Sequence, residues 1–224
     1  MLPEWLPWLL QVNDSQFPSG AYAHSLGLED LVQRDLIRDG EGLEVFLRDQ
    51  IGPALLAFDL PMFGRAHAAA AAERVDDLAA LDRELDAWKL AAEPRAASAR
   101  MGSRRLAMVR RLAPDPVLDA FAALGTPQHQ IVVAALELRG LPVAVGGCAV
   151  AHQTVTTYVT AAVKLLRLGQ ERAQAIIRAT LVDLAPSVSA AVDVAVDREP
   201  GWFNPLLEIA SLRHARARER LFIS

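Results

Sequence analysis

Two strong helix formers dominate this chain, which contains 40 alanines and 33 leucines among its 224 residues. Alanine and leucine rank highest in intrinsic helix propensity, whereas the β-branched and aromatic residues typical of sheets are comparatively sparse. The sequence shows no repeat period, no Gly/Ser linker and no shift in composition. We therefore predict one compact all-α domain over residues 1–224, built from about nine or ten helices.

Charge and cysteine content exclude several classes of protein. The 23 Lys and Arg against 27 Asp and Glu give a net charge of −4, whereas nucleic-acid binders are normally basic. Cys148 is the only cysteine and cannot form an internal disulfide, which fits a reducing compartment. The first residues lack the basic start of a signal peptide, and no apolar run approaches the roughly 18 residues of a membrane span. We predict a cytoplasmic protein with neither a nucleic-acid nor a membrane partner.

Apolar spacing and helix punctuation predict the individual helices. After Ser19, which can act as N-cap, the first helix is expected to begin at Gly20. Pro53 predicts a kink or break in the second. Asn204 is expected to cap the last helix, with Pro205 in its first position. The predicted ranges are 20–34, 43–58, 61–72, 76–88, 94–112, 116–124, 128–139, 143–168, 170–184, 186–196 and a final helix from 205.

The sequence contains few signs of catalytic or metal chemistry. We find no phosphate-binding P-loop, no nucleophile elbow and no His-Glu-x-x-His pair, so we predict that the protein is not an enzyme. Cys148 and His152 stand one helical turn apart and offer sulfur and nitrogen donors that suit Ni²⁺ or Zn²⁺. Two ligands do not complete a site, and the flanking residues are apolar. A packed thiol and a hydrogen-bonded imidazole are the competing interpretation.

Arginines and apolar residues gather near the end of the sequence. Arginines occupy positions 213, 216, 218 and 220, and Leu221, Phe222 and Ile223 follow them. Compensation of the helix dipole by a solvated face would explain the arginines. It would not explain the apolar residues, because chain ends are usually polar. We predict that 204–224 form a partner-docking helix and tail, with contacts from Arg213, Arg220, Leu221 and Phe222.

Gly20 and Gly27 are seven residues apart, and both fall within the first predicted helix. Glycine in a helix interior costs about 1 kcal/mol relative to alanine. The spacing therefore indicates that another element approaches one face closely. A second helix of the same chain and another subunit are both possible neighbours.

The two ends together resemble the UreF family of urease accessory proteins. The opening stretch 10–29 contains Phe17-Pro-Ser-Gly-Ala-Tyr-Ala-His, and the closing stretch 203–224 contains Arg220-Leu-Phe. Between them, the segments Lys164 to Gln170 and Glu93-Pro-Arg95 also resemble family motifs. The order of the motifs, the length and the helical content agree over essentially the whole chain.

This resemblance implies an all-α homodimer that catalyses no reaction of its own. Family members act as chaperones in the maturation of urease by nickel insertion. They bind UreD (also called UreH) and the nickel-carrying GTPase UreG, and the complex delivers Ni²⁺ to the urease apoprotein. No cofactor is expected to be bound permanently, because the complex handles the nickel.

The resemblance also assigns roles to individual residues. Tyr22 would lie near the dimer interface, where we also place Gly20 and Gly27. Glu29 and Lys164 would belong to the surface that engages the GTPase. Arg220 would become ordered with the tail when UreD binds.

Four positions depart from the family pattern. Ser19 replaces an aliphatic residue, Arg167 a proline, Ala173 a glycine and Ala215 an acidic residue. Two alternative functions compete with the chaperone role: direct nickel binding through Cys148 and His152, and a helical small-molecule sensor. Against a regulator of that kind, we find no helix-turn-helix with a basic recognition helix.

Overall fold

Helices account for all the regular secondary structure of the described part of the chain, which contains no strand. The structure is a computed structural model that describes residues 2–195, 199–217 and 219–223. Counted with the segment 40–71 as one helix, these residues form ten α-helices, which confirms the predicted all-α class. No helix of this part is long and apolar enough to cross a membrane. Outside the segment 40–71, the helices are α1 (Leu6–Asn13), α2 (Leu28–Gln33), α6 (Val75–Trp88), α7 (Ala92–Leu112), α8 (Pro116–Ala123), α9 (Gln130–Glu137), α10 (Val143–Leu165), α11 (Gln170–Ala191) and α12 (Pro205–His214).

The segment 40–71 is helical without interruption, so a break at Pro53 and separate helices over 43–58 and 61–72 are wrong, whereas a kink at Pro53 stays a prediction. It consists of α3 (Gly40–Phe46), the π-helical turn η2 (Leu47–Ile51), α4 (Gly52–Ala54), the π-helical turn η3 (Leu55–Asp59) and α5 (Leu60–Ala71). A π turn shifts the backbone hydrogen bonds from i→i−4 to i→i−5. The two turns lie on either side of Pro53, which has no backbone N–H to donate.

Three further expectations about the helices need correction. Pro186 lies within α11 and does not divide it into two helices; Val196, the end of the second predicted helix, lies outside the described residues. Helix α12 starts as predicted, because the Asn204 side chain accepts a hydrogen bond from the N–H of Leu207 at 3.1 Å. It ends at His214, so Arg216 and Arg220 lie beyond its last turn. Helix α1 was not predicted.

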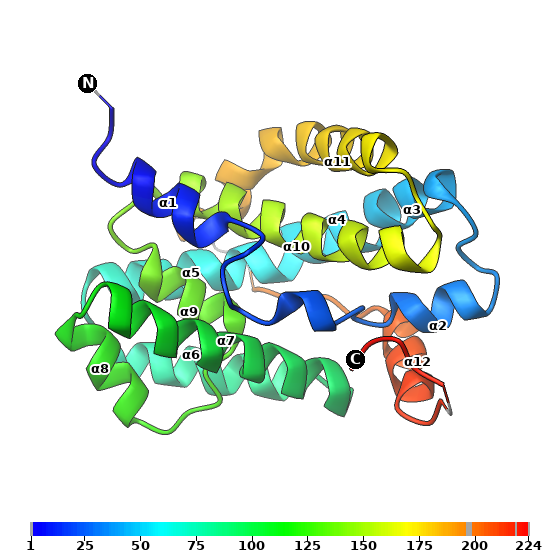
Figure 1. Ribbon diagram of the computed structural model, residues 1–224. Coiled ribbons are helices and arrows are strands. Elements are labelled where there is room, and N and C mark those ends of the chain that lie inside the picture. The colour runs from blue at the N-terminus through cyan, green and yellow to red at the C-terminus, as the bar shows by residue number, and fades with distance from the viewer. Residues whose placement is uncertain (1, 196–198, 218, 224) are drawn as a thin grey trace.

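The core consists of two hydrophobic clusters that share three long helices. One cluster gathers residues of α5 to α9, including Phe63 and Phe121, and the other gathers residues of α2 to α4, including Leu28 and Leu43. The segment 40–71, α10 and α11 each contribute side chains to both clusters. In Figure 1, α10 accordingly crosses the middle of the molecule, with α11 above it and α6 to α9 below. These shared helices join the two clusters into one body.

Glycines allow the backbones of neighbouring elements to approach closely at two places. A Cβ atom on Gly64 of α5 would lie 2.2 Å from the carbonyl oxygen of Val192. A Cβ on Gly102 of α7 would lie 1.9 Å from the carbonyl oxygen of Gln128. Real Cβ atoms do not tolerate such distances, so only glycine fits at these two contacts.

Candidate functional site

The C-terminal segment folds back onto the N-terminal part of the chain. Glu29, in the first turn of α2, is buried, and its two carboxylate oxygens face the backbone of this segment. Oε1 accepts a hydrogen bond from the N–H of Leu221 at 2.7 Å, and Oε2 accepts one from the N–H of Phe222 at 3.1 Å. Figure 1 shows the C-terminal end beside α2 as a result. We call the described residues after α12, 215–217 and 219–223, the tail.

A buried histidine connects Glu29 to a second carboxylate. Nε2 of His214, the last residue of α12, lies 2.9 Å from Oε2 of Glu29, and its Nδ1 lies 2.8 Å from Oε2 of Glu93 in α7. Each ring nitrogen of His214 therefore faces an oxygen of a different carboxylate. Arg220 of the tail adds a hydrogen bond from Nη1 to Oε1 of Glu93 at 2.9 Å. Two carboxylates thus face one histidine and one arginine side chain.

Apolar and cation–π contacts complete the attachment of the tail. Phe222 is buried in the second hydrophobic cluster, and the N–H of Ile223 donates to the carbonyl of Ala23 at 2.9 Å. Nζ of Lys164 lies 3.2 Å from the centroid of the Tyr22 ring and 5.0 Å from that of Phe222. Seven residues make these contacts between the tail and the rest of the chain, and we call them the tail cluster: Tyr22, Glu29, Glu93, Lys164, His214, Arg220 and Phe222.

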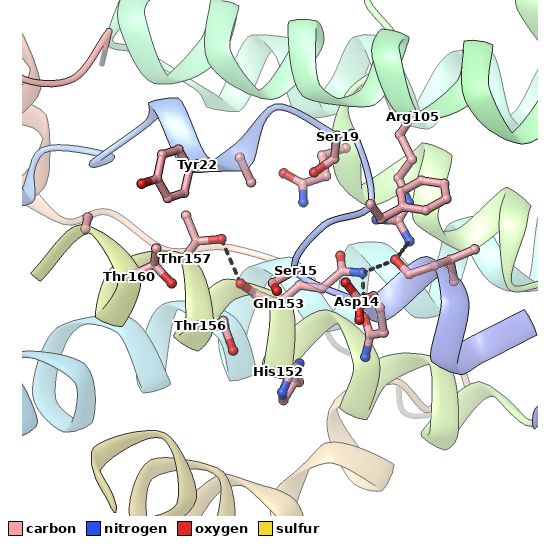
Figure 2. Close-up of a pocket in the computed structure, with 16 residues that line it drawn as sticks. Asp14, Ser15, Ser19, Tyr22, Arg105, His152, Gln153, Thr156, Thr157 and Thr160 are labelled. Atoms are coloured by element: carbon pink, nitrogen blue, oxygen red, sulfur yellow. Dashed lines mark hydrogen bonds between the residues drawn. The ribbon is translucent and has the colours of Figure 1, made fainter. Parts of the chain in front are cut away.

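A cavity lined by both polar and apolar residues lies beside the segment that carries Tyr22. Figure 2 shows Ser19 and Tyr22 on this segment, across the cavity from Gln153 and Thr157 of α10. The cavity has a volume of about 110 Å³. Arg105 lines the cavity. Its guanidinium forms a buried ion pair with Glu137 and donates a hydrogen bond to the carbonyl oxygen of Val12 at 3.0 Å. The start of the segment is therefore attached to α7 and α9 through Arg105.

Comparison with known proteins decides which family this fold belongs to. The UreF family model matches residues 37–181. A urease accessory protein UreF from Arthrobacter sp. (strain FB24) is 33% identical over 222 residues, which cover 96% of each chain. The chain belongs to the UreF family. A urease accessory protein UreF from Bacillus sp. (strain TB-90) is 32% identical over 96% of this chain and 97% of its own length. Another, from Azoarcus sp. (strain BH72), is 34% identical over 96% of this chain and 94% of its own length.

Of the residues that the UreF resemblance singled out, the structure brings most together. Tyr22, Glu29, Lys164, Arg220 and Phe222 all belong to the tail cluster, although they come from distant parts of the sequence. They differ in accessibility, because Glu29 and Phe222 are buried whereas Tyr22 is exposed. The other predicted contact residues, Leu221 and Arg213, are also exposed. Arg218, one of the four clustered arginines, lies outside the described residues.

Sequence reasoning missed the role of two residues of the cluster. His214 lies at a helix interface, and no sequence pattern indicated that it bridges two carboxylates. Glu93 was noted only as part of a family motif. The two residues are 121 positions apart in the sequence. Neither spacing nor composition connects positions so distant, so their contact could not be inferred from one sequence.

The predicted helix 20–34 is wrong, and the reasoning about its glycines changes with it. Gly20 and Gly27 have φ values of +82° and +90°, a left-handed conformation that ends regular structure. Only a short 3₁₀ turn, η1 (Ala21–Ala23), and α2 form in this range. A Cβ on Gly27 would lie 3.3 Å from Oγ of Ser211, so its close neighbour is α12 of the same chain. The role of the two glycines in a dimer stays a prediction.

The departures from the UreF pattern have a structural explanation at one position. Arg167 lies in the turn between α10 and α11 with φ +52°. Proline is restricted to φ near −65° and could not adopt this conformation. A UreF relative with proline here must therefore turn differently between the two helices. The structure does not explain the departures at Ser19, Ala173 and Ala215.

Cys148 and His152 line one groove, about 360 Å³ in volume, between α1, α10 and α11. Cys148 is exposed, but partial desolvation in the groove raises the pKa of its thiol, and burial lowers the pKa of the His152 imidazole. The imidazole is thus in the neutral form that binds metals, whereas the thiolate form of the cysteine is disfavoured. Among the described residues no group of three or more His, Cys, Asp or Glu could hold a metal ion. The pair supplies two donors and no more.

Helix α12 of this UreF protein carries apolar residues on two faces. Leu207 and Ala210 pack against the second hydrophobic cluster. Leu206, Ile209 and Leu212 are exposed and follow one another at three-residue steps. Large apolar side chains grouped on a surface are typical of interaction sites.

Proposed function

We propose that this protein acts as a non-catalytic adaptor in the maturation of urease. As a homodimer in the cytoplasm, it would connect UreD (UreH) with the GTPase UreG, so that the complex inserts nickel into the urease apoprotein. Membership of the UreF family supports the general role in maturation. The specific partners, the dimer and the absence of catalysis form part of the proposal.

The observation that carries this proposal is that the docked tail presents apolar side chains to solvent. The tail backbone is held by Glu29, while the side chain of Phe222 points inward and is buried. Its neighbours Leu221 and Ile223 are 63% and 56% exposed. Binding a partner through these side chains costs little backbone conformational entropy, because the segment that carries them is already ordered. Together with the exposed face of α12, they would form the surface for UreD.

Glu29 would act on partners indirectly. With the tail docked, its carboxylate is buried and fully engaged with donors of the same chain. We propose that Glu29 and Lys164 position the tail and the exposed ring of Tyr22, and that this ring contributes to the contact with UreG or with the second subunit.

Co-purification tests the proposal. An N-terminally tagged chain is expressed with UreD and UreG, and the double variant Leu221→Ser/Ile223→Ser is compared with Leu10→Ser. Leu10 of α1 is 65% exposed, and Figure 1 shows α1 away from the C-terminal end, so Leu10 provides a matched control. We expect the double variant to lose UreD at least tenfold while the control retains it. If both variants bind UreD equally well, the tail is not the docking surface.

The isolated chain is not expected to hold nickel tightly through Cys148 and His152. Ni²⁺ sites with two protein donors need further ligands to fill the coordination sphere, and the groove around this pair is apolar. Nickel would therefore be the cargo of the assembled complex.

A further inference from the structure

A second surface site, separate from the tail cluster, lies where α6 meets the segment before α12. It is a groove of about 290 Å³ lined by aromatic and aliphatic residues together with two carboxylates. The lining residues that carry the argument are Trp88, Leu90, Trp202, Phe203, Glu84 and Glu208.

Contacts behind the groove hold its walls in place. The Trp88 ring packs against Phe58, with 5.5 Å between the ring centroids and 57° between the planes. The N–H of Gly201 donates to the carbonyl of Ala57 at 3.1 Å, which fixes the backbone just before Trp202. Asn204, which follows the groove residues, donates from Nδ2 to Oε1 of Gln50 at 3.1 Å. The groove is thus already formed in the free chain.

The rings nevertheless remain open to solvent. Trp88, Trp202 and Phe203 are 44%, 38% and 61% exposed. Three large aromatic side chains side by side on a surface are a costly arrangement unless something binds them, because each ring buries a large apolar area when it is covered.

The charge of the groove indicates what binds. Glu84 is paired with Arg65, with 3.1 Å between Oε1 and Nη1. Oε2 of Glu208 accepts only the backbone N–H of Ala91, at 3.0 Å, and no side-chain cation contacts Glu208 within the described part of the chain. The faces of aromatic rings are also electrostatically negative. Aromatic faces beside an uncompensated carboxylate favour a cation.

We propose that this acidic aromatic groove binds an arginine side chain presented by a protein partner. A guanidinium is planar, stacks on indole rings and can form two parallel hydrogen bonds to a carboxylate such as that of Glu208. The exposed side chain of Leu90 at the edge would contact apolar residues on either side of that arginine. This proposal does not depend on the role of the tail cluster.

Nuclear magnetic resonance of the indole N–H groups tests the proposal with the full chain. Of the four tryptophans, Trp88 and Trp202 line the groove, whereas Trp5 and Trp8 do not and serve as internal controls. The probe is the peptide acetyl-Gly-Leu-Arg-Leu-Gly-amide, compared with the same peptide carrying neutral citrulline in place of arginine. We expect the arginine peptide alone to shift the signals of Trp88 and Trp202.

Two variants locate the charge and the aromatic contact. Glu208→Gln keeps an oxygen that can accept from Ala91 and is expected to weaken peptide binding about fivefold. Phe203→Ala, at an exposed position, is expected to weaken it by a similar factor. Glu171→Gln, an exposed change at the start of α11, is the matched control and should leave binding unchanged.

Several results would overturn the proposal. Equal shifts with the citrulline peptide, or undiminished binding by Glu208→Gln, would show that charge plays no part. Stronger shifts with tetramethylammonium than with the arginine peptide would indicate a site for a small organic cation. Shifts of Trp88 and Trp202 on raising the concentration of the chain alone would identify a second copy as the occupant.

Discussion

Replacing Glu29 by glutamine should release the tail while leaving the rest of the fold intact. In the native chain, Oε1 of Glu29 accepts from the N–H of Leu221 and from Nε2 of Gln33, and Oε2 accepts from His214 and the N–H of Phe222. A glutamine side chain offers one acceptor oxygen and one NH₂ group. In either orientation, the NH₂ group faces donors that it cannot satisfy.

The expected magnitude follows from the number and kind of hydrogen bonds lost. Hydrogen bonds to a charged group contribute about 1.5–3 kcal/mol each, and removal of one partner from a buried ion pair costs about 3–5 kcal/mol. We expect tail docking to weaken by about 3 kcal/mol, or at least about 100-fold in the equilibrium between docked and detached tail. Global stability should fall less, because the tail can detach before the helices unfold.

Hydrogen exchange of individual amides measures this equilibrium. The N–H groups of Leu221 and Phe222 should lose about 100-fold in protection in Glu29→Gln, while amides of α9 and α10 stay protected. Gln33→Ala is the control, because it removes only the 3.3 Å contact to Glu29 and should change tail protection less than tenfold. Tail protection in Glu29→Gln within threefold of the native value would refute the reasoning.

Three further predictions concern stability and metal binding. Gly102→Ala should lower the free energy of unfolding by about 3 kcal/mol in urea titrations, because its Cβ would collide with the Gln128 carbonyl. Gly140→Ala, whose Cβ would meet no atom within 4 Å, is the control and should change the free energy of unfolding by less than about 0.5 kcal/mol. Burial lowers the pKa of His67 below 6.5, so the unfolded chain binds the proton first as the pH falls, and the stability of the native chain decreases below pH 6.5. The difference between the urea midpoints at about pH 7.5 and pH 5.5 should therefore be smaller in His67→Gln than in the native chain. An unchanged difference would contradict this reasoning. Cys148→Ala should leave Ni²⁺ binding by the isolated chain unchanged in calorimetry, and a tenfold loss of affinity would instead establish a metal site.

The helices that could be predicted from the sequence are those in which spacing, caps and punctuation agree. Helices α6, α7 and α8 begin and end close to the expected residues, and the Asn204 cap of α12 is present. Pro53 and Pro186 misled the prediction, because both helices continue through the proline, with π turns on either side of Pro53. The positive φ of Gly27 depends on the position of α12, which local patterns do not contain.

The candidate site was predictable only in part, and only through the family resemblance. That resemblance named Glu29, Lys164 and Arg220, but the spacing of residues could not show that they share one cluster. Glu93 and His214 escaped because an ordinary glutamate and a lone histidine carry no distinguishing local pattern. Their partners lie 121 to 185 positions away, and such contacts depend on how whole helices pack.

The order of synthesis gives the attachment of the tail a consequence for folding in the cell. Glu29 leaves the ribosome 192 residues before Leu221, its hydrogen-bond partner. At about 5–20 residues per second, this interval lasts about 10–40 s. During that time the Glu29 carboxylate, which the native fold buries, has none of its distant hydrogen-bond donors, so α2 cannot form its native contacts with the tail. The nascent chain therefore forms the native hydrogen bonds of Glu29 only after His214, Leu221 and Phe222 have emerged. Any chain interrupted before them would keep Glu29 exposed to water.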